Sequence, residues 1–185
     1  FLSASAPEAT DPFLIRDMPQ AVELLHSAMT EGTPIAIYGD YDVDGVTSTV
    51  LLYELLQKLG VNPRIYIPNR FDEGYGLNLD AVEQLANEGI GLIITVDCGI
   101  RSVEEIALAR RLGMRVILTD HHQPGEVLPP ADAILNVHQL GDSYPFKDLV
   151  GVGLAYKLAA AYLTAYPQPG MSAEDWLDLV ALGTV

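Results

Sequence analysis

Apolar residues along this chain fall into short continuous runs that alternate with stretches of helical periodicity. The continuous runs predict buried strands at residues 35–39, 64–68, 91–97, 115–119 and 131–137. Amphipathic spacing predicts helices at residues 20–29, 46–59, 79–87, 102–112, 152–166 and 173–182. Because continuous apolar strands need cover on both faces, the pattern predicts an α/β fold. The expected architecture is a three-layer, Rossmann-like domain with a mainly parallel sheet and helices on both sides.

Length favours one main domain, since 185 residues can bury a sizeable core. We expect residues 1–33 to form an N-terminal arm with a short helix, and residues 34–185 to form the α/β domain. The chain begins with Phe1, so we expect it to be processed or cut from a longer protein. No apolar run reaches the roughly 18 residues that span a bilayer, so no membrane partner is expected. The single Cys98 excludes an internal disulfide and fits a reducing, cytoplasmic location.

Three carboxylates crowd the end of the first predicted strand, in the run Asp40-Tyr41-Asp42-Val43-Asp44-Gly45. If this segment is extended, the three Asp side chains point the same way, because side chains alternate along a strand. Like charges at such spacing repel one another, and a hard divalent cation with oxygen ligands is the simplest partner. Asp44 has an alternative role, as a cap for the helix predicted from residue 46.

Two later strands also end in polar residues: Asp97-Cys98-Gly99 and Asp120-His121-His122. Carboxyl ends of parallel strands share one edge of the sheet, so the three clusters are expected to converge. Carboxylates with imidazole suit manganese or magnesium, as one ion or a pair, and one Cys is too few for a structural zinc site. Taken singly, Asp97 could cap a helix and the His pair could lie on the surface. Three such clusters on one edge favour a metal site.

The net charge of −15 limits what these residues can bind alone. Most of it is expected to be a solvated acidic surface that keeps the protein soluble. Nucleic-acid-binding domains usually carry a basic patch, and only ten Lys and Arg are present. If the substrate is a polynucleotide, this chain by itself is therefore expected to bind it weakly.

The three clusters together resemble the DHH phosphoesterase superfamily, which takes its name from the third motif. Two further segments, residues 67–77 and 149–158, resemble the RecJ-like group of single-strand-specific 5′→3′ DNA exonucleases within it. The resemblance runs from about residue 35 to residue 185. Asp-His-His alone would be a weak signal, whereas five ordered segments at fitting spacing are a strong one.

The resemblance implies a role for each motif residue. The implied metal ligands are Asp40, Asp42, Asp44, Asp97 and His121, with Asp97 bridging two ions. His122 is implied to lie near the scissile phosphate, and Asp120 to orient His121 from behind it. Cys98, beside Asp97, is interpreted as buried packing at a strand end.

Two other segments are candidates for substrate contact. The same resemblance implies that Arg70 contacts a phosphate of the substrate. Gly151 and Gly153 open a predicted helix, where backbone N–H groups can receive phosphate; close packing of this helix on the sheet is the alternative. The family's fourth motif supplies a further metal-binding Asp after a segment like residues 182–185. We therefore expect an N-terminal catalytic fragment that lacks this ligand and the second catalytic domain.

The implied activity is hydrolysis of phosphodiester bonds with Mn²⁺ or Mg²⁺, two ions in the intact site. In the parent protein this would be 5′→3′ digestion of single-stranded DNA, with weak activity in these residues alone. Two alternatives remain open. One is a phosphoesterase for short oligonucleotides, cyclic dinucleotides or pyrophosphate; the other is a non-catalytic replication scaffold.

Overall fold

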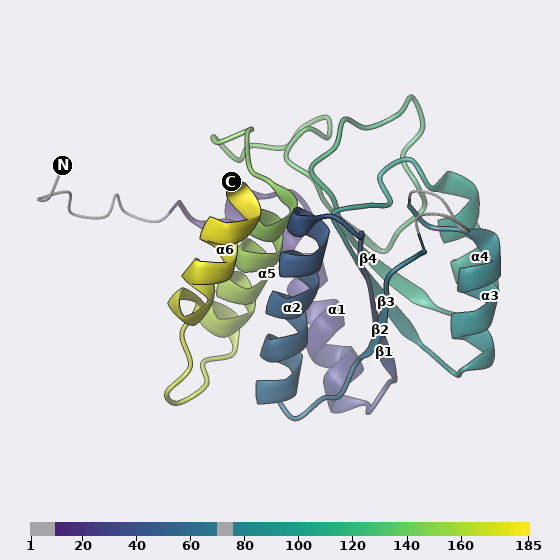
Figure 1. Cartoon of the computed structure of the whole chain (residues 1–185), viewed down its shortest axis with the longest axis horizontal. Helices are drawn as coiled ribbons and strands as arrows, with labels where there is room; N and C mark the ends of the chain where they lie inside the picture. Colours follow the sequence, from purple (N-terminus) through teal and green to yellow (C-terminus); the bar gives the residue numbers. More distant parts are fainter. Residues whose placement is uncertain (1–9, 70–75) are drawn as a thin grey trace, which may run out of the picture.

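A single parallel sheet forms the centre of the molecule, as seen in a computed structural model that describes residues 10–69 and 76–185 (Figure 1). Its five strands are β1 (Ile35–Tyr38), β2 (Arg64–Tyr66), β3 (Leu92–Val96), β4 (Arg115–Thr119) and β5 (Ala133–Leu135). Their order across the sheet is β2-β1-β3-β4-β5, and every neighbouring pair is parallel. The predicted parallel α/β sheet is therefore confirmed.

Helices cover both faces of this sheet (Figure 1). The helical elements are η1 (Pro12–Leu14), α1 (Met18–Thr30), α2 (Val43–Lys58), α3 (Leu79–Asn87), α4 (Val103–Arg111), α5 (Gly151–Ala165), η2 (Ala173–Trp176) and α6 (Leu177–Thr184). Helices α1, α2 and α5 pack on one face, with α6 against α2 and α5, and α3 and α4 pack on the other. This arrangement is the predicted three-layer architecture.

The continuous apolar strands divide their side chains between two cores. Along β3, Leu92, Ile94 and Val96 face the core beneath α1, α2 and α5, whereas Ile93 faces the core beneath α3 and α4. Successive side chains of a strand point to opposite faces, so a strand that is covered on both sides must be apolar throughout. Helix α1 contributes Met18, with four further apolar residues, to the first core. This helix, which the sequence grouped with an N-terminal arm, is therefore an integral part of the domain.

Two element boundaries differ from prediction in a way that matters for the site. Helix α2 begins at Val43, three residues earlier than predicted, with Asp42 as its N-cap. Asp44 therefore lies in the first helical turn, so the extended segment on which the three Asp side chains would point the same way ends at Asp42. Strand β3 ends at Val96, one residue early, and Asp97 takes a left-handed backbone conformation with φ of 60°.

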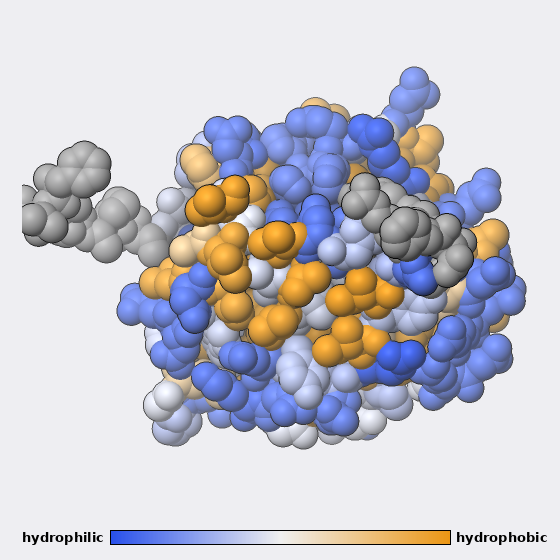
Figure 2. All heavy atoms as spheres, in the orientation of Figure 1, coloured by the Kyte–Doolittle hydropathy of each residue, from blue (hydrophilic) through white to orange (hydrophobic). Residues whose placement is uncertain are grey.

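The outer surface differs between the two helical layers. Figure 2 shows apolar side chains gathered over α2 and α6, whereas the side formed by α3 and α4 is mostly hydrophilic. The exposed large apolar residues of α2 and α6 are Val43, Val46, Leu177 and Leu182. Within the described parts of the chain, no helix combines the length and apolar character needed to cross a membrane.

Candidate metal centre

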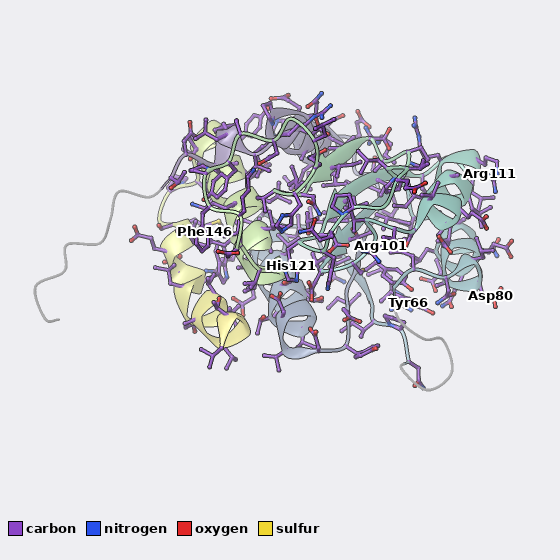
Figure 3. All side chains as sticks on the ribbon, turned by 90° about the horizontal axis from the view of Figure 1, so that it is seen from above. Tyr66, Asp80, Arg101, Arg111, His121 and Phe146 are labelled. Carbon is purple, nitrogen blue, oxygen red and sulfur yellow. The ribbon has the colours of Figure 1, made fainter. Side chains whose placement is uncertain are left out.

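Three buried carboxylates meet at the carboxyl edge of the sheet, which Figure 3 shows from above. Asp40 follows β1, Asp97 follows β3 and Asp120 follows β4, and these strands are neighbours in the order β1-β3-β4. At least 98% of the surface of each Asp is buried. The structure thus brings together the three clusters that the sequence placed at separate strand ends.

The first group of oxygen atoms comes from Asp40, Asp42 and Asp97, whose carboxylates each offer one oxygen within 4.8 Å of the others. Asp42 also caps α2 by accepting a hydrogen bond of 2.9 Å from the N–H of Gly45. Among the described residues, Oδ1 of Asp40 has no hydrogen-bond partner. Burial, followed by the charge of Asp42, raises the pKa of Asp40. A buried oxygen without a donor, surrounded by other carboxylates, is suited to a divalent cation.

Gly45 allows α2 to start directly against this group. A Cβ at residue 45 would lie 2.7 Å from both Cβ and the carbonyl oxygen of Asp40, closer than atoms can approach. Any side chain there would push the first turn of α2 away from Asp40. The Asp-Gly sequence at residues 44–45 therefore sets the distance between strand β1 and the helix that carries Asp42 and Asp44.

Asp97 joins the carboxylates to the imidazoles. Oδ1 of Asp97 lies 3.1 Å from Nε2 of His121, and Asp97, His121 and His122 form a second group of ligand atoms within 4.8 Å of one another. Burial raises the pKa of Asp97 to about 6, and the nearby charges of Asp44 and Asp42 add to this, while His121 opposes it. Asp97 is the one residue that belongs to both groups of ligand atoms among the described residues.

The two histidines have different carboxylate partners. Nε2 of His121 faces Asp97 and lies 3.7 Å from Oδ2 of Asp44, and the contact with Asp97 is the main cause of its raised pKa. His122 places Nδ1 2.7 Å from Oδ1 of Asp120, which raises the pKa of His122. The same oxygen accepts the backbone N–H of His122 at 3.0 Å. The other oxygen of Asp120 accepts the N–H of Ile100 at 2.8 Å.

The prediction that Asp120 orients His121 is therefore wrong, because Asp120 holds His122. The reason is local: an Asp carboxylate readily accepts the backbone N–H two residues ahead, and this turn brings the ring of residue 122 to the same oxygen. Asn136, which the sequence analysis did not single out, fixes the turn from the other side. Its amide donates a 2.9 Å hydrogen bond to the carbonyl of His122. No separate signal marked Asn136 in the sequence, because the strand predicted at residues 131–137 included it.

Asp44 has a different position from Asp40 and Asp42. Its two oxygens accept hydrogen bonds of 2.7 Å each from the N–H groups of Gly151 and Val152, at the start of α5. Burial raises the pKa of Asp44, and these two N–H groups oppose the rise. A carboxylate at a helix N-terminus is favourable both for the unpaired N–H groups and for the helix dipole. Asp44 therefore ties the start of α2 to the start of α5.

The prediction that Gly151 offers its N–H to a substrate phosphate is contradicted, because Asp44 already occupies that N–H. A Cβ on Gly151 would lie 2.7 Å from Oδ1 of Asp97, so glycine is needed for α5 to approach the buried carboxylate. A Cβ on Gly153 would lie 2.7 Å from the Leu149 side chain. Gly151 thus supports the alternative of close packing against the sheet, whereas the contact at Gly153 lies within the segment that leads into α5.

Two further sequence predictions concern Arg70 and Cys98. Arg70 lies outside the described residues. Cys98 is fully buried, and its thiol lies 3.8 Å from the carbonyl oxygen of Tyr38. Burial raises the pKa of Cys98 well above its usual value, so the thiolate that a nucleophile requires is disfavoured. The interpretation of Cys98 as strand-end packing is confirmed.

The fold and the convergent carboxylates and imidazoles define an α/β domain with a metal-binding carboxyl edge. The chain belongs to the DHH family: the model of the DHH family, N-terminal domain, matches residues 34–184. Single-stranded-DNA-specific exonuclease RecJ of Bacillus subtilis is 46% identical over 185 residues, which are all of this chain and 23% of the relative. RecJ of Escherichia coli is 45% identical over 176 residues, 90% of this chain and 30% of the relative.

Solved structures show the same likeness. A crystal structure of exonuclease RecJ bound to manganese matches with a TM-score of 0.83 and 34% identity, over 92% of this chain and 43% of that one. RecJ of Thermus thermophilus in complex with Mn²⁺ matches with a TM-score of 0.79 and 32% identity, over 92% of this chain and 24% of that one. The chain spans less than a third of the length of the curated relatives named above.

Proposed function

We propose that residues 34–185, together with α1, form the metal-binding DHH domain of a two-metal nuclease that removes nucleotides from single-stranded DNA in the 5′→3′ direction. The observation that carries the proposal is the buried junction at Asp97, which shares one group of ligand atoms with Asp40 and Asp42 and another with His121 and His122. The names of the relatives support the substrate, since both are single-stranded-DNA-specific exonucleases.

In this proposal Mn²⁺ or Mg²⁺ is held by Asp40, Asp42, Asp97 and His121. When bound, such ions supply Lewis-acid chemistry, polarising a phosphoryl oxygen and lowering the pKa of a water molecule. Asp97 would hold the two positions together, and a cation nearby would favour the charged form of this carboxyl, which burial disfavours. The RecJ structures that this chain resembles contain manganese, and RecJ of Thermus thermophilus is also known in complex with Mg²⁺.

His122 contributes a proton donor beside these positions. Asp120 contacts Nδ1 at 2.7 Å and raises the pKa of His122, so the ring favours its protonated form. With Nδ1 held by Asp120, we assign the protonated ring the role of donor to a non-bridging phosphate oxygen. The negative charge on that oxygen grows in the transition state, and a fixed donor stabilises it there.

Asp44 acts indirectly in this proposal. By accepting the N–H groups of Gly151 and Val152, it seats the start of α5 against Asp97. We place a further acidic ligand, and the surface that binds the DNA strand, outside residues 1–185. The net charge of −15 supports a DNA-binding surface outside these residues, because binding of a DNA strand depends on Lys and Arg that neutralise its phosphates. The single, buried Cys98 supports work in a reducing compartment, the cytoplasm.

The test is a chimera in which residues 1–185 replace the matching segment of the Bacillus subtilis relative. Digestion of single-stranded DNA labelled at either end, with manganese at low salt, gives both activity and polarity. We expect 5′→3′ digestion by the chimera, little by residues 1–185 alone, and loss of turnover in His122→Ala with metal occupancy kept. Cleavage of cyclic dinucleotides or pyrophosphate but not of DNA would contradict the proposal.

A further inference from the structure

Asp142 is a buried carboxylate outside the metal centre. Its side chain has no exposed surface, and it lies in the β5–α5 loop, residues 136–150, which leads from β5 to α5. One of its oxygens accepts the backbone N–H of Arg16 at 2.8 Å. The other accepts the N–H of Tyr144 at 2.9 Å and the ammonium of Lys147 at 2.7 Å. Burial of a charge is costly unless donors surround it, so these three contacts fix the carboxylate in one place.

Hydrogen bonds continue from Asp142 to the turn that carries His122. The ammonium of Lys147 donates to the carbonyl of Val137 at 2.8 Å as well as to Asp142. Val137 directly follows Asn136, whose side-chain amide donates to the carbonyl of His122 at 2.9 Å. A continuous route of hydrogen bonds and one peptide bond therefore joins the buried carboxylate to the backbone of His122.

Residues that precede α1 hold the same loop from its outer side. The guanidinium of Arg16 donates to the carbonyl of Leu140, and the hydroxyl of Ser143 donates to the carbonyl of Leu14 at 3.0 Å. The match to the DHH family model covers residues 34–184, so Leu14 and Arg16 lie before it. The β5–α5 loop is thus held by a part of the chain that precedes the matched family domain.

We propose that Asp142 is a positioning residue for His122, and that residues 14–16 hold the β5–α5 loop in the arrangement that this positioning needs. The inference rests on the proposed function, in which His122 donates to a phosphate oxygen of the substrate. Such a donor stabilises the transition state only if its direction is fixed, since a displacement of about 1 Å can lower a rate about 100-fold. Asp120 fixes the ring of His122 at Nδ1, and Asn136 fixes the backbone of the same residue. Asp142 acts through Asn136.

The first measurement is amide hydrogen exchange, followed by NMR, in residues 1–185 and in two loop variants, Asp142→Asn and Lys147→Met. Asp142→Asn keeps the shape of the side chain and removes its charge. Lys147→Met removes the ammonium from a half-exposed side chain, so it tests the route even if Asp142→Asn does not fold. The matched control is Asp132→Asn at the opposite edge of the sheet, because Asp132 also accepts a backbone N–H, at 2.8 Å, and pairs with Arg110 at 3.5 Å.

We expect both loop variants to speed exchange at the backbone amide of His122 about tenfold, the effect of one weakened hydrogen bond, and to leave the amide of Ile100 unchanged. Both amides donate to Asp120, but only His122 lies in the turn that Asn136 holds. Asp132→Asn should change neither amide. Equal acceleration at His122 and Ile100, or no acceleration at His122, would overturn the inference.

The second measurement is digestion of single-stranded DNA by the chimera that carries the same substitutions. The two loop variants should lower kcat about tenfold and leave KM and manganese affinity unchanged, because they displace a group that acts in the transition state. Asp142 belongs to neither group of metal-ligand atoms among the described residues. Lys147→Arg keeps a cation beside Asp142 and should restore most of the rate. A fall in manganese affinity along with kcat, or equal kcat in Asp142→Asn and Asp132→Asn, would contradict the positioning role.

The two measurements separate this inference from the proposed function. Exchange is measured without substrate, and hydrolysis is measured in the chimera. If exchange responds as expected while the unsubstituted chimera digests no DNA, the proposed activity is wrong and the placement of the His122 turn by Asp142 stands. If the chimera digests DNA equally fast with and without the loop substitutions, the activity stands and Asp142 has no positioning role.

Discussion

The two edges of the sheet follow opposite rules. At the amino edge, four helices turn into the next strand through a glycine with positive φ: Gly32, Gly60, Gly89 and Gly113, with φ of 68°, 85°, 81° and 88°. At the carboxyl edge, Asp97 adopts φ of 60° although it carries a side chain, and buried Asp40 has an oxygen without a partner among the described residues. At the amino edge, glycine occupies the positions where the backbone needs a positive φ. At the carboxyl edge, Asp97 has a positive φ that is unfavourable for a residue with a side chain, and the carboxylate of Asp40 is buried at a cost in free energy.

Gly113 illustrates the first case. It follows the last turn of α4, and a Cβ there would meet nothing within 4 Å, so only the backbone requires glycine. Asp97 illustrates the second, because a left-handed conformation costs an L-residue about 1 kcal/mol and burial of its charge costs more. Local strain and buried charge gather where a ligand can relieve them, and the difference between the edges therefore locates the site.

The largest expected effect is on stability in the absence of metal. Burial raises the pKa of Asp97 from 3.8 to about 6, so the folded state binds its proton more tightly than the unfolded state does. Its contribution is present below pH 4 and is lost as the pH rises through 6; the total is about 3 kcal/mol, of which about 2 kcal/mol falls between pH 4.5 and 7. Urea unfolding of the chelator-treated protein at pH 4.5 and 7 measures it. Asp97→Asn should remove most of this fall in stability, and an unchanged pH dependence in the variant would place the buried charge elsewhere.

Metal affinity should show the next largest effect. Asp97→Asn should weaken manganese binding by more than about 100-fold. Loss of a residue that only hydrogen-bonds to a metal ligand costs about 10–100-fold in affinity, and this variant loses a carboxylate ligand itself. Asn tolerates left-handed φ, so the variant keeps the backbone and removes the charge. Calorimetric titration measures the affinity, with Asp178→Asn in the first turn of α6 as the matched control. Equal affinity in both variants would exclude the bridging role of Asp97.

Two glycine substitutions compare the edges directly: Gly151→Ala at the carboxyl edge and Gly113→Ala at the amino edge. Gly151→Ala should lower the free energy of unfolding by about 2 kcal/mol, because its Cβ would overlap the Asp97 carboxylate 2.7 Å away and force α5 to shift. It should also weaken manganese binding, since Asp97 and Asp44 both contact the start of α5. If Gly151→Ala lowered the stability but left the manganese affinity unchanged, the position of α5 would not influence the metal site.

The smallest expected effect is at the amino edge. Gly113→Ala should cost about 1 kcal/mol of stability, from backbone strain alone, and should leave manganese affinity at the wild-type value. Urea unfolding and the same calorimetric titration give both numbers. A change in metal affinity here would mean that the two edges are coupled through the sheet, and the contrast between them would not hold.

Much of the candidate site was predictable, and the exceptions share a cause. Asp40, Asp97 and His121 could be placed together because they follow adjacent parallel strands. The partner of Asp120 was assigned wrongly, because the choice between His121 and His122 depends on how one turn is closed. The Gly151 N–H was assigned to substrate because nothing near residue 151 in the sequence indicates that Asp44, more than 100 residues earlier, occupies it.

The sequence by itself determined the order of strands and helices, the parallel sheet and the edge at which its polar strand ends meet. These depend on periodicities within each segment and on the single handedness of parallel connections, so they can be read locally. Only the tertiary structure decided which carboxylate faces which partner: Asp44 the start of α5, Asp120 the ring of His122, and Asp97 both groups of ligand atoms. Those choices depend on contacts of about 3 Å between segments far apart in the chain. Such contacts are fixed by how the helices seat on the sheet, not by any local pattern.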